Sequence, residues 1–199
     1  MNYIVPVEKE IDFTRAEKAM ISNYKWLEGY TPEAYAQLIY VEDKGFALRM
    51  TAIESNPKAL YTQYNEPVYK DSCLEFFASF NNANQKYMNF EMNSNGAFLA
   101  AVRTDRANKT PIDMLAPLPK VTATKDENSW TVEVFFSNDF IGKTFGKFSF
   151  VRGESFKGNF YKCGDETEIP HFGMWSPVEN EKPDFHRPEF FGTFTIAKA

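Results

Sequence analysis

Motifs that mark most catalytic and cofactor sites are missing from this sequence. It has no Gly-x-Ser-x-Gly turn, no glycine-rich phosphate loop, no His-Glu-x-x-His helix and no Cys-x-x-Cys pair. These absences speak against the serine hydrolases, nucleotide-dependent enzymes and metallopeptidases that use them. We therefore expect a protein that is not an enzyme and that binds no cofactor.

Histidine and cysteine are also scarce, with two residues of each. His171 and His186 lack a third ligand at a recognisable spacing, so we predict no metal site and expect both to form hydrogen bonds from loops. Cys73 and Cys163 are able to form one disulfide, but two cysteines in a chain without an export signal are more often reduced. We expect two buried thiols, in the core or near the functional site.

A targeting segment is not visible either. Residues 1–8 lack the basic region and the apolar stretch of a signal peptide, and no run approaches the roughly 20 apolar residues of a membrane span. The sequence as given predicts a cytoplasmic protein with no membrane partner, and a secreted one if a leader has been trimmed from it.

Positive charge is outweighed, with 22 Lys and Arg against 27 Asp and Glu, and no basic cluster stands out. Nucleic-acid binding draws its affinity from counterions that such clusters release, so we predict no nucleic-acid partner. Aromatic residues are abundant at 17%, and no linker divides the 199 residues. This composition predicts one folded domain over residues 1–199, and it leaves the oligomeric state open.

Short strands separated by turn signals predict an all-β fold. Gly45 and the pair Asn95-Gly96 mark the turns of two hairpins. We expect strands at residues 35–41, 46–53, 72–80, 87–93, 97–103, 130–136, 145–152, 159–163 and 192–197. A cap-like start predicts one short N-terminal helix at residues 12–20, and prolines indicate a long loop at residues 107–120. Together these elements predict an antiparallel β-sandwich that is jelly-roll-like.

Period-two alternation divides the predicted strands into a core face and a polar face. We expect Met88, Phe90, Met92, Trp130, Val132 and Val134 to point into the core. If the strands are neighbours, the opposite face gathers Glu75, Asn89, Glu91, Asn93, Asn159 and Tyr161. Amides, carboxylates and phenols suit the vicinal hydroxyls of a sugar, and aromatic rings stack on its C–H face. The alternative is an ordinary solvated sheet face.

Three motifs resemble the family 9-like carbohydrate-binding modules, in the branch found as stand-alone bacterial proteins. They are residues 69–77, with the pattern Asp-Ser-x-x-Glu, the hairpin strand 89–93, and the run 159–192. The resemblance covers roughly residues 20–197 and implies an antiparallel β-sandwich that binds a saccharide ligand. In that family, the xylanase-attached members grip the reducing end of a glycan between two Trp side chains, aided by an acidic residue and an Arg.

The resemblance also assigns roles to residues of this chain. It implies that the acidic sugar ligand is Glu75, that the stacking aromatics are Tyr69 and Phe185, and that His186 lies adjacent. The family's Arg falls near Glu91, so an anion stands where a cation is usual. Some members hold structural calcium, but no Asp-rich loop of clear ligand spacing occurs here. The Trp of the family's core corresponds to Trp175.

We therefore predict non-catalytic carbohydrate binding on one sheet face and its loops. Arg187 either anchors the closing loop through a carboxylate or touches the ligand. One alternative is a glycoside-processing enzyme that uses Glu75 and Glu91, and another is a non-sugar protein-interaction domain. Hydrolysis needs one carboxyl with a raised pKa, whereas we expect amide neighbours to keep Glu75 ionised. The predicted ligand-binding residues are Tyr69, Glu75, Asn89, Glu91, Asn93, Tyr161, Phe185, His186 and Arg187.

Overall fold

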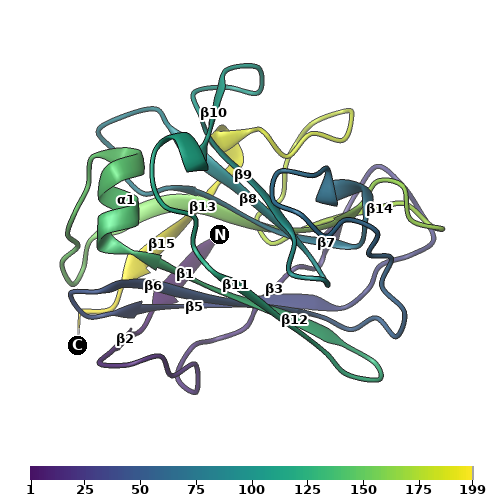
Figure 1. Cartoon of the computed structure of the whole chain (residues 1–199), viewed down its shortest axis with the longest axis horizontal. Coiled ribbons are helices and arrows are strands. Elements are labelled where there is room, and N and C mark those ends of the chain that lie inside the picture. The colour runs from purple at the N-terminus through teal and green to yellow at the C-terminus, as the bar shows by residue number, and fades with distance from the viewer. Residues whose placement is uncertain (199) are drawn as a thin grey trace.

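Two β-sheets packed face to face make up the computed structural model, which describes residues 1–198 (Figure 1). The larger sheet has the order β1 (Asn2–Val5), β15 (Gly192–Ile196), β13 (Ser155–Gly164), β7 (Cys73–Ser79), β8 (Tyr87–Asn93), β9 (Phe98–Arg103) and β10 (Lys109–Pro111). At its side, β14 (His171–Met174) pairs with β13 and with β4 (Asn23–Tyr24).

The smaller sheet has the order β11 (Val121–Lys125), β12 (Trp130–Ser137), β6 (Gly45–Ala52), β5 (Ala34–Val41) and β2 (Val7–Glu8), with β3 (Ala19–Met20) paired to β5. One α-helix, α1 (Asn138–Phe145), follows β12. Single 3₁₀ turns lie at η1 (Val68–Lys70), η2 (Ile112–Met114) and η3 (Pro188–Phe190). Within residues 1–198, none of the helices has the length and apolar character that crossing a bilayer requires.

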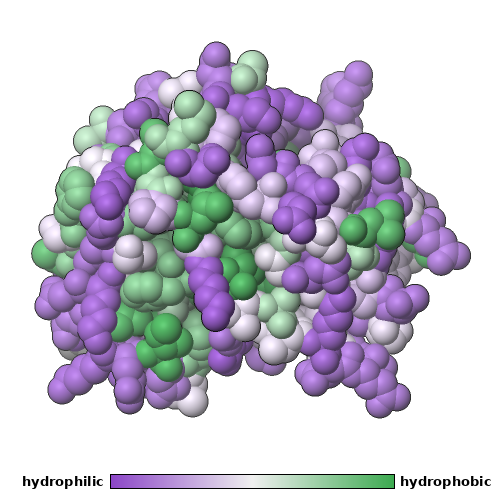
Figure 2. Space-filling view, in the orientation of Figure 1, coloured by the Kyte–Doolittle hydropathy of each residue, from purple (hydrophilic) through white to green (hydrophobic). Residues whose placement is uncertain are grey.

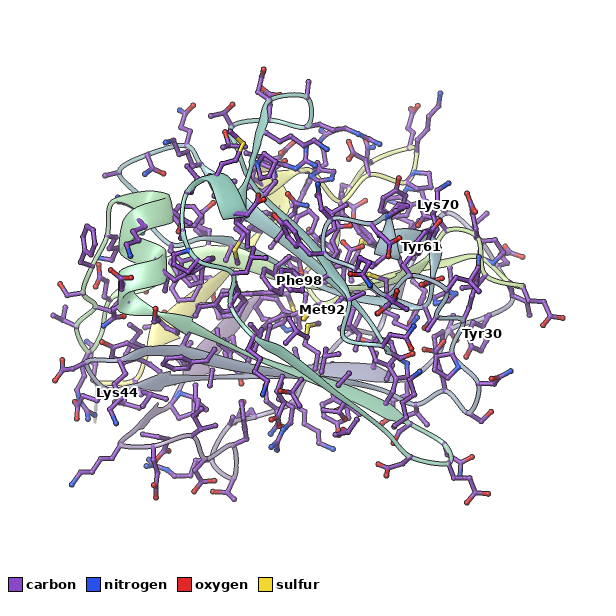
Figure 3. The ribbon with its side chains drawn as sticks, viewed as in Figure 1. Tyr30, Lys44, Tyr61, Lys70, Met92 and Phe98 are labelled. Carbon is purple, nitrogen blue, oxygen red and sulfur yellow. The ribbon has the colours of Figure 1, made fainter. Side chains whose placement is uncertain are left out.

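The core between the sheets is built largely from phenylalanine. Met88, Phe90, Met92, Trp130, Val132 and Val134 are all buried there, which confirms the predicted core face. Phe76 and Phe160 stack with ring centroids 5.2 Å apart, and Trp175 is also part of this core. Figure 3 labels Met92 and Phe98 between the two layers. Burial of each such side chain stabilises the fold by roughly 1.5–3 kcal/mol.

The predicted helix at residues 12–20 is wrong. Asp12 does not cap a helix there, because its Oδ1 accepts a hydrogen bond from Thr14 N at 2.9 Å and closes a turn instead. The chain then enters β3. The α-helix lies at α1, where Ser137 Oγ accepts from Phe140 N and Gly146 ends the helix with a φ of 74°. A left-handed residue at this position is a common helix terminator.

Two other expectations need correction. The strand predicted at residues 145–152 does not form, because α1 runs to Phe145 and turns follow it. The sheets are not purely antiparallel, since β1 pairs with β15 and β2 with β5 in parallel. Inside the long loop predicted at residues 107–120, the structure has β10 and η2.

The outer surface is mostly polar, with smaller hydrophobic areas between the polar side chains in the view of Figure 2. Large side chains that remain exposed include Met114, Phe148 and Val151. Scattered apolar residues of this kind are usual on folded proteins and do not by themselves mark a site.

Candidate functional site

The second face of the larger sheet is covered by loops rather than open to water. Phe77, Tyr87 and Tyr161 point to this face, and all three are fully buried in a second aromatic cluster with Phe185 and Phe191. The alternation predicted for β7, β8 and β13 is therefore correct. The solvated-face interpretation is wrong for these strands, because Glu75, Asn89, Glu91, Asn93 and Asn159 are buried too.

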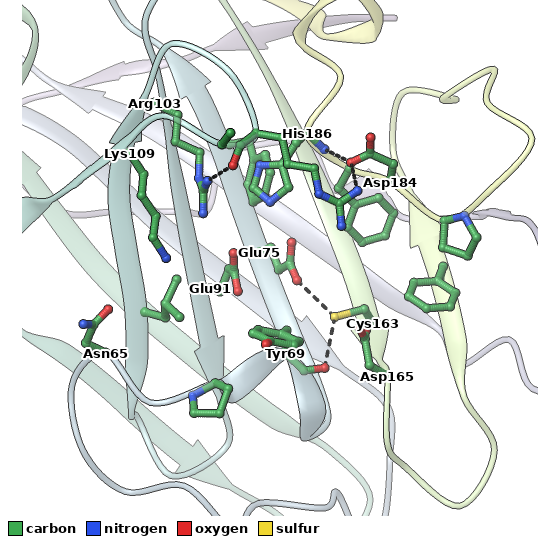
Figure 4. Close-up of a pocket in the computed structure, with 18 residues that line it drawn as sticks. Asn65, Tyr69, Glu75, Glu91, Arg103, Lys109, Cys163, Asp165, Asp184 and His186 are labelled. Carbon is green, nitrogen blue, oxygen red and sulfur yellow. Dashed lines mark hydrogen bonds and ion pairs between the residues drawn. The ribbon is translucent and has the colours of Figure 1, made fainter.

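A pocket of about 580 Å³ remains between this face and its covering loops (Figure 4). Its lining includes Tyr69, Glu75, Glu91, Arg103, Phe185 and His186. Glu75, Glu91 and Arg103 come from β7, β8 and β9, while Tyr69 comes from η1 and Phe185 from the segment before η3. This volume is in the range of small-molecule sites.

Tyr161 and Asn89, two of the predicted binding residues, lie behind the pocket wall instead of lining the pocket. The rings of Tyr161 and Phe185 are stacked, with centroids 4.0 Å apart, and the Tyr161 hydroxyl donates to Phe185 O at 3.3 Å. Asn89 Nδ2 donates to Glu91 Oε1 at 2.9 Å. Tyr161 therefore holds Phe185 in place, and Asn89 holds Glu91 in place, and neither faces the open space.

Asn93 and Arg187 have structural contacts outside the pocket lining. Asn93 Nδ2 donates to Tyr61 O at 2.8 Å and to Asp71 Oδ2 at 2.9 Å, which ties the β8–β9 turn to a neighbouring loop. Arg187 donates to Glu189 Oε1 at 2.8 Å and to Asn180 Oδ1 at 3.0 Å. Of the two interpretations of Arg187, these bonds favour the anchoring of the closing loop.

Two carboxyl groups are buried side by side in the pocket wall. Glu75 and Glu91 are register partners on β7 and β8 and are 3% and 4% exposed. Glu75 Oε1 accepts from the Cys163 thiol at 3.0 Å, and Glu91 Oε1 accepts from Asn89. Residues 1–198 donate no hydrogen bond to Oε2 of either group. The Oε2 atoms of Glu75 and Glu91 are therefore available to a ligand in the pocket.

Burial changes how these groups titrate. Desolvation, followed by the nearby charge of Glu91, raises the pKa of Glu75 well above its ordinary value. Desolvation raises the pKa of Glu91 to about 7, although Asn89 and Arg103 act in the opposite direction. Desolvation likewise raises the pKa of Asp165 in the pocket wall to about 6. Among residues 1–198, the expected amide donors to Glu75 are not found, because Asn89 donates to Glu91, and burial shifts the pKa of Glu75 upward rather than downward.

Arg103 is a pocket residue that the sequence analysis missed. It ends β9 opposite Tyr87, its Nε donates to Asn89 Oδ1 at 2.6 Å, and its Nη1 donates to Arg106 O at 2.5 Å. The alternation of Phe98, Ala100 and Val102 into the core puts Arg103 on the polar face, so the signal was present in the sequence. This arginine supplies a cation beside Glu91 from the neighbouring strand.

His186 closes the pocket next to Arg103 (Figure 4). Its Nδ1 lies 3.1 Å from the Tyr87 hydroxyl, and its ring packs on Phe77 with centroids 5.1 Å apart. Burial, followed by the charge of Arg103, lowers the pKa of His186 to about 3. The imidazole is therefore a neutral hydrogen-bonding group at physiological pH.

Comparisons with known proteins identify the family and the fold. The model of carbohydrate-binding family 9 matches residues 6–196. A solved structure from Bacteroides uniformis, described as a carbohydrate-binding protein, is 24% identical with a TM-score of 0.82, and the match covers 98% of each chain. No curated protein matches this sequence.

Two solved family 9 carbohydrate-binding modules from Caldicellulosiruptor kristjanssonii are also similar. The one in complex with cellotriose is 11% identical with a TM-score of 0.72, and the match covers 100% of this chain and 95% of that one. The one in complex with glucose is 13% identical with a TM-score of 0.63, covering 100% and 96%. Identities this low establish a likeness of fold.

Proposed function

The chain belongs to carbohydrate-binding family 9, and from this premise we propose that it binds a glycan end or a small saccharide without cleaving it. The observation that carries the proposal is that one pocket combines aromatic rings, among them Tyr69 and Phe185, with carboxyl groups, among them Glu75 and Glu91. This combination suits the apolar C–H face and the hydroxyl edge of a pyranose.

The carboxyl groups are suited to hydroxyl recognition in either protonation state. Each has one oxygen fixed by a protein donor, and its second oxygen is left for the ligand. An ionised carboxylate accepts hydrogen bonds from hydroxyls, and a protonated carboxyl also donates one. Because Arg103 adds N–H donors at the same pocket, a ligand with vicinal hydroxyls meets both acceptors and donors there.

One observation favours glycoside hydrolysis, namely the raised pKa of Glu91, which is about 7. Hydrolysis, however, needs carboxyls that flank the scissile bond, with one of them ionised. Glu75 and Glu91 are adjacent on one wall, and burial raises the pKa of both. We therefore propose that pure protein releases no product from aryl-glycosides. Cleavage that disappears in Glu75→Gln or Glu91→Gln would establish the enzyme instead.

Calorimetric titration with a glycan panel tests the binding proposal, starting with glucose and cellotriose because similar solved modules hold them. Tyr69→Ala should weaken binding by about 1–3 kcal/mol, since it removes a stacking ring. The matched control is Tyr35→Ala, which removes a partly exposed tyrosine of β5 outside the pocket and should leave affinity unchanged. If no saccharide binds at millimolar concentration, the proposal fails in favour of a protein-interaction domain.

A further inference from the structure

The two cysteines of the chain meet a carboxyl group where β7 and β13 pair. Cys73 and Cys163 are register partners, and Glu75 points to the same face two residues further along β7. Both Sγ atoms and one carboxylate oxygen of Glu75 lie within 4.8 Å of one another. All three side chains are buried, and neither cysteine forms a disulfide.

This spacing is close to that of the ligands around a tetrahedral metal ion. Zinc binds sulfur at about 2.3 Å and carboxylate oxygen at about 2.0–2.2 Å, which puts neighbouring ligands roughly 3.5–4 Å apart. Because no two of these atoms are more than 4.8 Å apart, shifts of about 1 Å at the side-chain ends bring three ligands to this spacing. The Cys163 thiol lies 3.0 Å from Glu75 Oε1, so this edge of the triangle has to widen by roughly 0.5–1 Å to hold the ion.

The donor set selects the kind of ion. Two thiolates favour zinc and other thiophilic cations over calcium and magnesium, which prefer oxygen ligands. We propose that Cys73, Glu75 and Cys163 form a binding site for a thiophilic divalent cation, of which Zn²⁺ is the common biological example. The proposal rests on these three residues and stands or falls separately from saccharide binding.

An ion can reach this position from the pocket. Glu75 and Cys163 both line the pocket, and Figure 4 marks the hydrogen bond that joins them. Three protein ligands leave a fourth tetrahedral position for water or a pocket ligand. On binding, both thiols release their protons, so two thiolates and the Glu75 carboxylate hold one divalent cation with a net charge of −1.

Titration of the full chain with Co²⁺ under a thiol-free reductant tests this site. We expect one Co²⁺ per chain, a thiolate-to-cobalt charge-transfer band, and the intense d–d bands of tetrahedral coordination. Stoichiometric Zn²⁺ should abolish these bands by displacement. The charge-transfer band should disappear in the double variant Cys73→Ser/Cys163→Ser, whereas Glu91→Gln, which changes the neighbouring carboxyl, should keep it.

A second measurement uses the unmodified protein, so it still tests the site if the cysteine variants do not fold. Zn²⁺ that binds the native state should raise the melting temperature of the unmodified protein, and the rise should grow with Zn²⁺ concentration. The proposal is overturned if reduced protein with two titratable thiols gives no charge-transfer band. It is also overturned if the band persists in a folded double variant, or if the purified protein carries a Cys73–Cys163 disulfide that reductant does not open.

Discussion

Lys162 shows how a single buried charge is accommodated in this fold. Its ammonium group is fully buried and donates to His171 Nε2 at 2.6 Å and to Ser72 Oγ at 3.0 Å, while Glu54 Oε2 lies 3.4 Å away. Trp130 Nε1 also donates to Glu54 Oε2, at 2.8 Å. These partners compensate the cost of removing the charges from water, and a change to any one of them leaves another unpaired.

The bond to Lys162 also sets the state of His171. Because Nε2 accepts from the ammonium group, Nδ1 carries the proton and donates to Ile169 O at 2.9 Å. A second proton would bring two cations together. Burial, and then the charge of Lys162, lower the pKa of His171 to about 4.

We predict that His171 destabilises the protein in acid. Between pH 6.5 and about 4 the unfolded chain binds a proton at this histidine and the folded chain does not, so the free energy of unfolding falls as the pH falls. Relative to His171→Gln, which does not titrate, the native protein should lose roughly 3 kcal/mol between pH 7 and pH 4. Urea unfolding of both proteins at the two pH values measures this; a constant difference would contradict it.

At the scale of elements, β13 connects the larger sheet, because it pairs with β7, β14 and β15. Gly158 lets β13 and β7 approach each other closely. A Cβ atom at this position would lie 2.5 Å from Phe77 O and 3.0 Å from the Phe194 ring. Since the first of these neighbours is backbone, it cannot rotate away.

Gly158→Ala should therefore force the two strands apart. We expect a loss of about 1–3 kcal/mol in the free energy of unfolding, the usual cost of overpacking. The control is Lys157→Ala at the neighbouring exposed position, which should change the stability by about 0.5 kcal/mol or less. Denaturant unfolding of both variants decides the matter, and equal stabilities would show that the strand contact is not limiting.

The elements that were predictable from the sequence are those with local signals. Gly45 and Asn95-Gly96 define hairpins by turn chemistry alone, and both hairpins are confirmed. The short strands β1 and β2 were missed because their parallel partners lie far away in the chain. For α1, the signals were Ser137 and Gly146 at its ends, but its aromatic and β-branched residues are weak helix formers.

The site was predictable to the same limited extent. Alternation and the family resemblance, which the family match confirms, identified Tyr69, Glu75, Glu91, Phe185 and His186, and all five line the pocket. Their roles in binding stay predictions. The burial of this face was not predictable, because it depends on loops that pack over it from distant parts of the sequence. A long-range bond to Tyr61 takes Asn93 out of the pocket lining, whereas local bonds to Glu189 and Asn180 hold Arg187 outside it.

At the scale of the whole molecule, the two ends of the chain contribute to one sheet. β1 adds Tyr3 and Val5 to the core beside Phe160 and Phe194. The jelly-roll connectivity, the single domain over residues 1–199 and the cytoplasmic location stay predictions.

Deletion of residues 1–8 should prevent stable folding. It removes the buried side chains of Tyr3, Val5 and Val7, each worth roughly 1.5–3 kcal/mol, from a total stability that is typically about 5–15 kcal/mol. Circular dichroism and thermal melting measure the outcome. As a control, Ile4→Ser alters the exposed side of the same strand and should leave the fold intact. A deletion variant that melts at the native temperature would contradict this prediction.

The parallel pairing of β1 with β15 also determines how the molecule responds to mechanical force. Asn2 lies opposite Thr193 and Val5 opposite Ile196, and bonds from Thr193 N to Met1 O and from Ala197 N to Val5 O lie at the two ends of the pair. Tension applied before β1 and after β15 pulls these strands lengthwise in opposite directions. Their hydrogen bonds are then loaded together in shear, rather than opened one after another, so the pair acts as a clamp against stretching.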